Sequence, residues 1–424
     1  MSPSVPPAVP APPAALGKLD IAAPGFFLRA DYDELLAWLR ANDPVHRSAN
    51  GMVLVSRYDD IRDISRQPER FTSRRGALIN DPLRAAEPND ASGSLLHLDP
   101  PIHADYRKLL NREFTPRAVA RMESAVRAAV TKAFDALAVD ATDGAIVDYV
   151  DSVASAVPVA VIADLLGMTD HDPAQLRRWS DATIEVSDNP SAEVLEAVTE
   201  FAVFLDGHVR QRFAAAGGES PGDDLLSLLA TSHVGDVPLT PAQVQMFCLT
   251  LVVAGNETTR SLLSGGALAL AEHPEQRARL VAGLDEPAGA QLLTAAVEEC
   301  LRWTTPIQAF CRTVMRAGEI SGVPVAANDY LVLLYASGNR DESVFGPTAD
   351  RFDVTRPASP AHLAFGFGEH LCLGASLARM EARMVLEELL RRHPTYEVVG
   401  EVDERSYVPS TLTRSLATLP LRLG

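Results

Sequence analysis

The stretch FGFGEHLCLG, residues 365–374, places a single cysteine, Cys372, among three glycines. Glycines leave the backbone bare, so a flat and bulky group can approach it closely. A helix-like run follows from Gly374 to Glu381, and a helix N-terminus favours a thiolate over a thiol. Cys372 is therefore a candidate nucleophile or metal ligand, with a small apolar core residue as the alternative.

The surroundings of Cys372 favour one kind of ligand. No Cys or His stands at chelating spacing to complete a zinc site. A cysteine hydrolase lacks an evident base, because the nearest histidine, His370, lies only two residues away. A cofactor that brings its own equatorial ligands fits this thiol better.

The composition is globular, and the charge excludes two classes of partner. The chain has 424 residues, 47% of them hydrophobic, and a formal net charge of −18. We therefore expect no nucleic-acid partner and no attraction to anionic membranes. No apolar run reaches the roughly 20 residues that span a bilayer, so we expect no membrane anchor.

The ends and the cysteines suggest compartment and domain count. The four cysteines lie far apart without a CxxC pair, which fits the reducing cytoplasm. Residues 1–17 are rich in proline and lack signal-peptide features, so we expect a disordered leader. We expect residues 18–424 to form one domain, with a small β-rich N-terminal region and a large helical region.

Most of the chain has helical periodicity, as in residues 31–43, 173–187 and 191–217. Residues 51–56 read as a short apolar strand, and residues 318–335 alternate turn signals with β-friendly runs, which predicts a hairpin. The fold class is therefore mainly α with a minor β-sheet.

One predicted helix is unusual. Thr240 and Pro241 form a start signal, and helix-compatible sequence continues to His273. Its middle is apolar nearly all round, which indicates burial, yet it contains GNETT at 255–259. A buried acid or hydroxyl is costly unless it is hydrogen-bonded. We expect either a kink or break into two helices, or a core helix opened beside a reactive group.

The run from Phe365 to Gly374, followed by LAR at 377–379, resembles the haem-binding signature of the cytochrome P450 family. The resemblance covers nearly everything after the leader. It implies the cytochrome P450 fold, a triangular helical domain with a long central helix over the haem. It also implies that Cys372 is the axial thiolate ligand of haem b (iron protoporphyrin IX), with Phe365, Gly366 and Gly374 beside the cofactor.

Further positions match the same family. Glu299 and Arg302 are similar to its ExxR pair, and with Arg351 they resemble a buried charge triad; an ordinary i,i+3 ion pair is the alternative. A second set resembles the partners of the haem propionates, for which a cation is the sensible choice. These residues are His103, Arg107, Arg312 and His370.

The stretch AGNETT, residues 254–259, resembles the part of the family's long helix that crosses the distal haem face. Ala254 would lie against the cofactor, and Gly255 would widen the helix for dioxygen. Glu257 and Thr258 match the family's acid–alcohol pair, in which Thr258 orients dioxygen and Glu257 relays protons from solvent. The resemblance implies a monooxygenase that inserts one atom of O2 into a C–H or C=C bond.

Two other functions are compatible with the same fold. A hydrogen-peroxide-driven peroxygenase typically replaces the acid–alcohol pair, which this sequence keeps. A non-catalytic haem-thiolate sensor or carrier has no need of a proton relay.

The resemblance also implies partners. Nothing in the chain resembles a flavin or iron–sulfur domain, so a ferredoxin and its ferredoxin reductase are the expected electron donors, and we expect a monomer. A local positive patch is a candidate docking surface, made of Arg107, Lys108, Arg112, Arg379 and Arg383.

The substrate pocket implied by the resemblance is mostly apolar, which predicts a hydrophobic small molecule. Its residues are Leu78, Ile79, Val253, Ala254, Ile307, Ala309, Phe310 and Leu412. Residues 301–313 and 337–346 look similar to those of bacterial members that act on steroids, sterol side chains or terpenoids. A fatty acid or an aromatic compound is the alternative.

Overall fold

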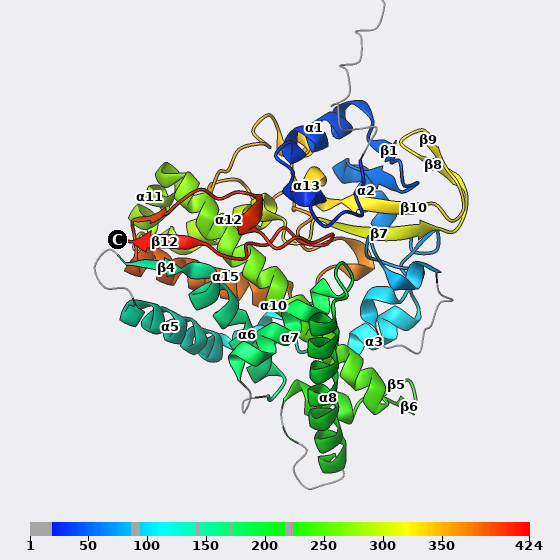
Figure 1. Cartoon of the computed structure of the whole chain (residues 1–424), viewed down its shortest axis with the longest axis horizontal. Helices are drawn as coiled ribbons and strands as arrows, with labels where there is room; N and C mark the ends of the chain where they lie inside the picture. Colours follow the sequence, from blue (N-terminus) through cyan, green and yellow to red (C-terminus); the bar gives the residue numbers. More distant parts are fainter. Residues whose placement is uncertain (1–18, 86–93, 141–144, 169–171, 217–221, 223) are drawn as a thin grey trace, which may run out of the picture.

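The computed structural model describes residues 19–85, 94–140, 145–168, 172–216, 222 and 224–424. The predicted leader, residues 1–17, lies outside these ranges. The described chain is mainly helical, with small sheets (Figure 1). The α-helices are α1 (Tyr32–Asn42), α2 (Tyr58–Ser65), α3 (Ile102–Asn111), α4 (Pro116–Ala120), α5 (Glu123–Asp140), α6 (Ala156–Leu165), α7 (Pro173–Glu185), α8 (Ala192–Ala215), α9 (Leu225–Ala230), α10 (Pro241–Glu272), α11 (Pro274–Gly283), α12 (Gly289–Thr304), α13 (Tyr335–Gly338), α14 (Glu342–Phe345) and α15 (Ala375–Arg392).

Short helical turns and strands complete the chain. The turns are η2 (Phe26–Leu28), η3 (Pro82–Ala85), η5 (Leu95–His97), the π-helical η6 (Val150–Ser155), η7 (Gly368–His370) and η8 (Glu404–Ser406). The strands are β1 (Val45–Arg47), β2 (Val53–Val55), β3 (Phe71–Thr72), β4 (Ile146–Asp148), β5 (His233–Val234), β6 (Val237–Pro238), β7 (Ala309–Val314), β8 (Gly318–Ile320), β9 (Val323–Val325), β10 (Tyr330–Leu334), β11 (Tyr396–Val398) and β12 (Pro420–Leu423).

Helix α10 crosses the middle of the molecule (Figure 1). Thr240 caps it: the N–H of Gln243 donates to the Thr240 hydroxyl, and the Gln243 side chain accepts the N–H of Thr240. The helix is continuous to Glu272, so the predicted bounds are confirmed and the alternative of a break into two helices is wrong. Burial of its middle against neighbouring helices compensates for the three glycines inside it, Gly255, Gly265 and Gly266.

The main sheet joins distant parts of the chain in the order β1-β2-β10-β7-β3. Strand β10 pairs with β2 in parallel, and the other pairs are antiparallel. Strands β8 and β9 form the predicted hairpin, with Ser321 and Gly322 at positive φ in its turn. The β-rich region therefore combines N-terminal strands with residues 309–334 and is not N-terminal alone. The single domain at 18–424 stays a prediction.

The buried side chains form three clusters. The largest lies among the helices. The other two pack against the main sheet, and β7 contributes to both because its side chains alternate: Ala309 and Cys311 belong to one cluster, while Phe310 packs against the other. None of the described helices is long and apolar enough to cross a membrane.

Candidate active site

Cys372 lies in the loop between η7 and α15, and backbone geometry explains two of its glycines. The N–H of Cys372 donates to the carbonyl oxygen of Phe365 at 2.8 Å, which closes the loop. Gly366 and Gly368 have φ of 70° and 76°, a conformation that favours glycine. A Cβ on Gly368 would also lie 2.3 Å from the carbonyl oxygen of Ser65.

The interpretation of all three glycines as clearance for a ligand is therefore corrected. Gly366 and Gly368 are needed for the turn and for its packing on α2. Only Gly374 is open on its Cβ side, where no described atom lies within 4 Å.

The residue Cys372 is exposed, whereas the other three cysteines are buried. Protein atoms surround its sulfur, and this desolvation raises the pKa of the Cys372 thiol. The N–H of Gly374 and the guanidinium groups of Arg107 and Arg379 oppose the rise, because they stabilise a thiolate. A coordinated metal ion would supply the remaining positive charge.

Four residues predicted to act together do converge beside this loop. His103, on α3, is 2% exposed, and its ring centroid lies 4.4 Å from that of His370. Arg107, one turn further along α3, donates to the carbonyl oxygens of Glu369, at 3.1 Å, and Leu371. Arg312 is 4% exposed on β7 and donates to the carbonyl oxygen of Cys311 at 2.6 Å.

These four residues, His103, Arg107, Arg312 and His370, form a cation cluster. Burial, together with the positive charges of Arg107 and Arg312, lowers the pKa of His103 to about 4. Burial and Arg312 likewise hold the pKa of His370 well below its usual range. Within the described ranges, no carboxylate forms an ion pair with either arginine, and Nε2 of His103 is buried without a hydrogen-bond partner. A ligand that carries carboxylates fits this cluster.

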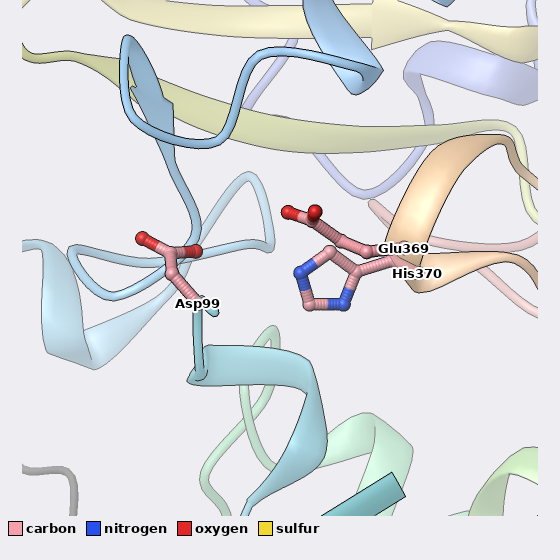
Figure 2. A group of neighbouring side chains, drawn as sticks. All are labelled: Asp99, Glu369 and His370. Atoms are coloured by element: carbon pink, nitrogen blue, oxygen red, sulfur yellow. The ribbon is translucent and has the colours of Figure 1, made fainter. Parts of the chain in front are cut away.

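An acidic group that sequence reasoning missed lies beside His370. Figure 2 shows Asp99, Glu369 and His370, whose ligand atoms lie within 4.8 Å of one another. Asp99 accepts hydrogen bonds from the hydroxyl of Thr72 and the N–H of Ser73. Burial and the nearby Asp99 raise the pKa of Glu369 to about 7. Asp99 is therefore hydrogen-bonded within the protein, and the hydroxyl of Ser73 contacts Nε2 of His370 at 3.2 Å.

Glu299 and Arg302 form a buried clamp on the segment that leads to the cysteine loop. The Arg302 guanidinium donates to both carboxylate oxygens of Glu299 at 2.7 Å, and to the carbonyl oxygen of Asn339 at 2.8 Å. The Asn339 side chain in turn accepts the N–H of Leu363 at 2.6 Å, two residues before Phe365.

The third charge of this clamp differs from the prediction. Arg356 donates to Glu299 at 3.1 Å, whereas Arg351 is exposed and contributes only its carbonyl oxygen, to Arg302 and Arg356. The assignment of Arg351 to the triad is therefore wrong. The turn at 351–356 points the earlier arginine to solvent and the later one inward.

The acid–alcohol pair on α10 has partners that sequence reasoning missed. Glu257 is 2% exposed and ion-paired with Arg260, which also donates to Asp181 of α7 at 2.9 Å. Burial raises the pKa of Glu257, and Arg260 opposes the rise. The i,i+3 spacing of Glu257 and Arg260 is a signal that sequence reasoning could have used. Thr258 donates to the carbonyl oxygen of Ala254 at 2.6 Å, and Ala254 is exposed although it lies mid-helix.

The residues predicted to line the substrate pocket divide into two groups. Partial or full exposure is found at Leu78, Val253, Ala254, Ile307, Phe310 and Leu412. Ile79 and Ala309 are 2% and 1% exposed and belong to the core cluster of Phe27 and Tyr32. Their assignment to the pocket is wrong, for Ala309 because strand alternation turns it away from Phe310 and Arg312.

The predicted positive patch is smaller than expected. Arg379 is held by Glu298, with N–O distances of 2.6 and 2.9 Å, and Arg107 is turned toward the cysteine loop. Lys108 and Arg112 are exposed on α3, and Leu371 beside Cys372 is 46% exposed.

Comparison with known proteins identifies the family. The family model described as Cytochrome P450 matches residues 217–396. The steroid C26-monooxygenase of Mycobacterium tuberculosis is 33% identical over 404 residues, which cover 95% of this chain and 96% of that protein. The chain belongs to the cytochrome P450 family. A methyl-branched lipid omega-hydroxylase of Mycobacterium bovis is 34% identical, over 98% of this chain and 96% of that protein.

Solved cytochrome P450 structures agree in fold. Cytochrome P450 CYP268A2 of Mycobacterium marinum, solved in complex with pseudoionone, superposes with a TM-score of 0.83 at 33% identity. The match covers 95% of this chain and 98% of that one. This cytochrome P450 is therefore a monooxygenase with a haem-thiolate cofactor, and the exposed Cys372 and the cation cluster fit a haem.

Proposed function

We propose that this cytochrome P450 hydroxylates a carbon near the end of a large apolar molecule, a steroid side chain or a branched, terpenoid-like lipid. The observation that carries the haem chemistry is the exposed Cys372 beside two buried groups, His103 and Arg312, and two half-buried ones, Arg107 and His370, where neither described arginine is ion-paired with a carboxylate. Two relatives named for a steroid C26 and a lipid omega position support the substrate class. The half-buried apolar side chains Leu78 and Leu412 suit such a ligand.

The cofactor is haem b in this proposal. Cys372 would be the thiolate ligand of its iron. The cation cluster would bind its propionates, because carboxylates would give hydrogen-bond partners to both guanidiniums and to the unpartnered Nε2 of His103. Phe365, Gly366 and Gly374 would lie beside the cofactor. When bound, the haem activates dioxygen and transfers one oxygen atom to the substrate.

In this proposal, residues of α10 supply protons to the distal side of the haem. The Thr258 hydroxyl donates to the carbonyl oxygen of the exposed Ala254, and its oxygen atom can accept a hydrogen bond from a proton donor on the distal side. Glu257 relays the proton. Protons from solvent reach Glu257 by way of Asp181 and Arg260. Asp181 lines a surface groove between α6, α7 and α8. Burial raises the pKa of Glu257, so the carboxyl group can carry a proton closer to neutral pH than a free glutamate.

Electrons come from a ferredoxin and its reductase in this proposal. Lys108 and Arg112 are exposed on the helix whose Arg107 bonds the cysteine loop, and they offer an acidic partner a positive surface. The exposed Leu371 supplies an apolar contact next to Cys372.

A binding and turnover panel tests the proposal. Cholesterol-type steroids, branched terpenoid alcohols and straight-chain fatty acids are titrated into the haem-loaded enzyme, and the low-to-high spin shift is recorded. We expect the shift for steroids or branched lipids, followed by a terminal alcohol when ferredoxin, reductase, NADH and O2 are supplied. Turnover with hydrogen peroxide alone, and none with ferredoxin, would favour a peroxygenase.

A further inference from the structure

A single carboxylate joins three segments that surround the proposed substrate pocket. Asp188 lies in the turn between α7 and α8. Its carboxylate accepts hydrogen bonds from Nδ2 of Asn80 at 3.0 Å, from the N–H of Thr411 at 2.8 Å and from the Thr411 hydroxyl at 2.7 Å. Asn80 and Thr411 lie in the two segments that carry Leu78 and Leu412, respectively.

The first of these segments, residues 76–83, is anchored to the main sheet. The carbonyl oxygen of Ala77 accepts the N–H of Cys311 at 2.7 Å, and that of Leu78 accepts the Tyr330 hydroxyl at 2.6 Å. Within the segment, the Asp81 carboxylate accepts the N–H groups of Ala77, at 2.8 Å, and Leu78, at 3.1 Å. This wall is therefore held by β7 and β10.

The second segment, residues 410–413, is anchored at the other end of β7. The N–H of Gln308 donates to the carbonyl oxygen of Leu412 at 2.9 Å, and Ile307 pairs with Thr413 in an isolated bridge. The Ser410 hydroxyl accepts the N–H of Leu412 at 3.0 Å, which fixes the turn. Both segments are therefore hydrogen-bonded to β7 or to the residue immediately before it.

The α7–α8 turn has no comparable anchor apart from Asp188. Among bonds between described residues, the others made by 186–191 stay within α7, the turn and α8, such as Nδ2 of Asn189 to Glu185 at 2.7 Å. Charge-assisted hydrogen bonds are about twice as strong as neutral ones, and Asp188 makes three. Loss of its carboxylate would detach the turn from both walls at once.

We propose that Asp188 is a positioning residue that fastens the α7–α8 turn to the two walls of the pocket and so controls ligand entry and release. This proposal rests on the proposed function, because it takes these segments as the walls of the substrate pocket. In the fastened state the apolar pocket is closed over its ligand, and breaking the three bonds opens it.

The test uses the haem-loaded full chain and 4-phenylimidazole, which binds haem iron and reports its binding by a spectral shift. Stopped-flow rates are compared for the wild type, Asp188→Ala, Asn80→Ala and their double variant. We expect Asp188→Ala to raise the release rate about tenfold. Asn80→Ala also removes the bond from Nδ2 to the carbonyl oxygen of Ala22 at 3.1 Å. It should have a smaller effect than Asp188→Ala, and the two effects should not add fully in the double variant, because both substitutions remove the bond between Asn80 and Asp188.

Asn189→Ala is the matched control, because this neighbouring side chain bonds only within its own turn, and its release rate should equal that of the wild type. Equal release rates for the wild type and Asp188→Ala, with an unchanged CO difference spectrum, would overturn the proposal. A wild type without the red-shifted CO band would instead overturn the proposed haem function.

Discussion

At the scale of single residues, Arg260 is the side chain that balances the buried acid of α10. It pairs with Glu257 and Asp181. Glu257 and Arg260 are buried, where an unpaired charge is costly, whereas Asp181 is partly exposed. We expect Arg260→Leu to raise the pKa of Glu257 further, because the buried carboxylate loses its nearest cation. Glu257 then gives up its proton to the relay less readily than in the wild type.

The measurement is the yield of product per NADH consumed, together with the hydrogen peroxide released. Product yield should fall in Arg260→Leu while NADH consumption continues. The Glu257→Gln side chain cannot ionise, so product formation in this variant should fall about a hundredfold. Unchanged coupling in both variants would refute a proton role for the pair. Equal spin shifts on substrate binding serve as the control.

At the scale of elements, α12 depends on a clamp that reaches toward the cysteine loop. Arg302→Met removes the pairing of Glu299 inside the core and the bonds to Asn339, so we expect destabilisation by about 3–5 kcal/mol. Chemical unfolding of the haem-loaded protein gives the free energy. Arg351→Met is the matched control, because that side chain is exposed and should change stability by less than about 0.5 kcal/mol.

Helix α15 carries a buried acid with its own pH signature. Burial raises the pKa of Glu381 to about 8, and Oε2 of this residue has no hydrogen-bond partner in the described part of the chain. The unfolded carboxyl ionises near pH 4.3, roughly, whereas the folded one stays protonated until about pH 8. The folded state therefore binds more protons in this window, and its stability falls as pH rises.

Glu381→Gln should remove this dependence. Relative to the wild type, the variant should gain up to about 1.4 kcal/mol per pH unit between roughly pH 5 and 8. Urea unfolding at several pH values measures the difference, and parallel stability curves for the two proteins would contradict the assignment. Glu388→Gln, a surface change in an ion pair with Arg392, should run parallel to the wild type.

At the scale of the whole molecule, the sequence predicted features set by neighbouring residues better than it predicted contacts between distant residues. The cap at Thr240, the hairpin turn and the four-residue spacing of His103 and Arg107 are written in neighbouring residues, and the structure has each of them. Arg356, Asp181 and Asp188 act through partners more than 50 residues away, which periodicity does not reveal. The predictions for Arg351 and Ala309 were wrong because their side chains point away from the expected site. A turn or the alternation of a strand changes that direction within one or two residues.

The distribution of charge makes a prediction for electron transfer. The molecule is acidic overall, but Lys108 and Arg112 are exposed beside the cysteine loop. Arg112→Glu should slow reduction by ferredoxin several-fold at low salt and leave the substrate spin shift unchanged. Arg422→Glu, a surface reversal on β12, is the control. Unchanged reduction rates in Arg112→Glu would place the docking surface elsewhere.

The central claim is that Cys372 is the thiolate ligand of a haem, and the reduced-plus-CO difference spectrum tests it most directly. A thiolate ligand shifts the Soret band of the CO complex far to the red. The account predicts this band in the wild type and its loss in Cys372→Ser, with the circular dichroism of the two proteins alike. A wild type without the band, or a Cys372→Ser variant that retains it, would contradict the account.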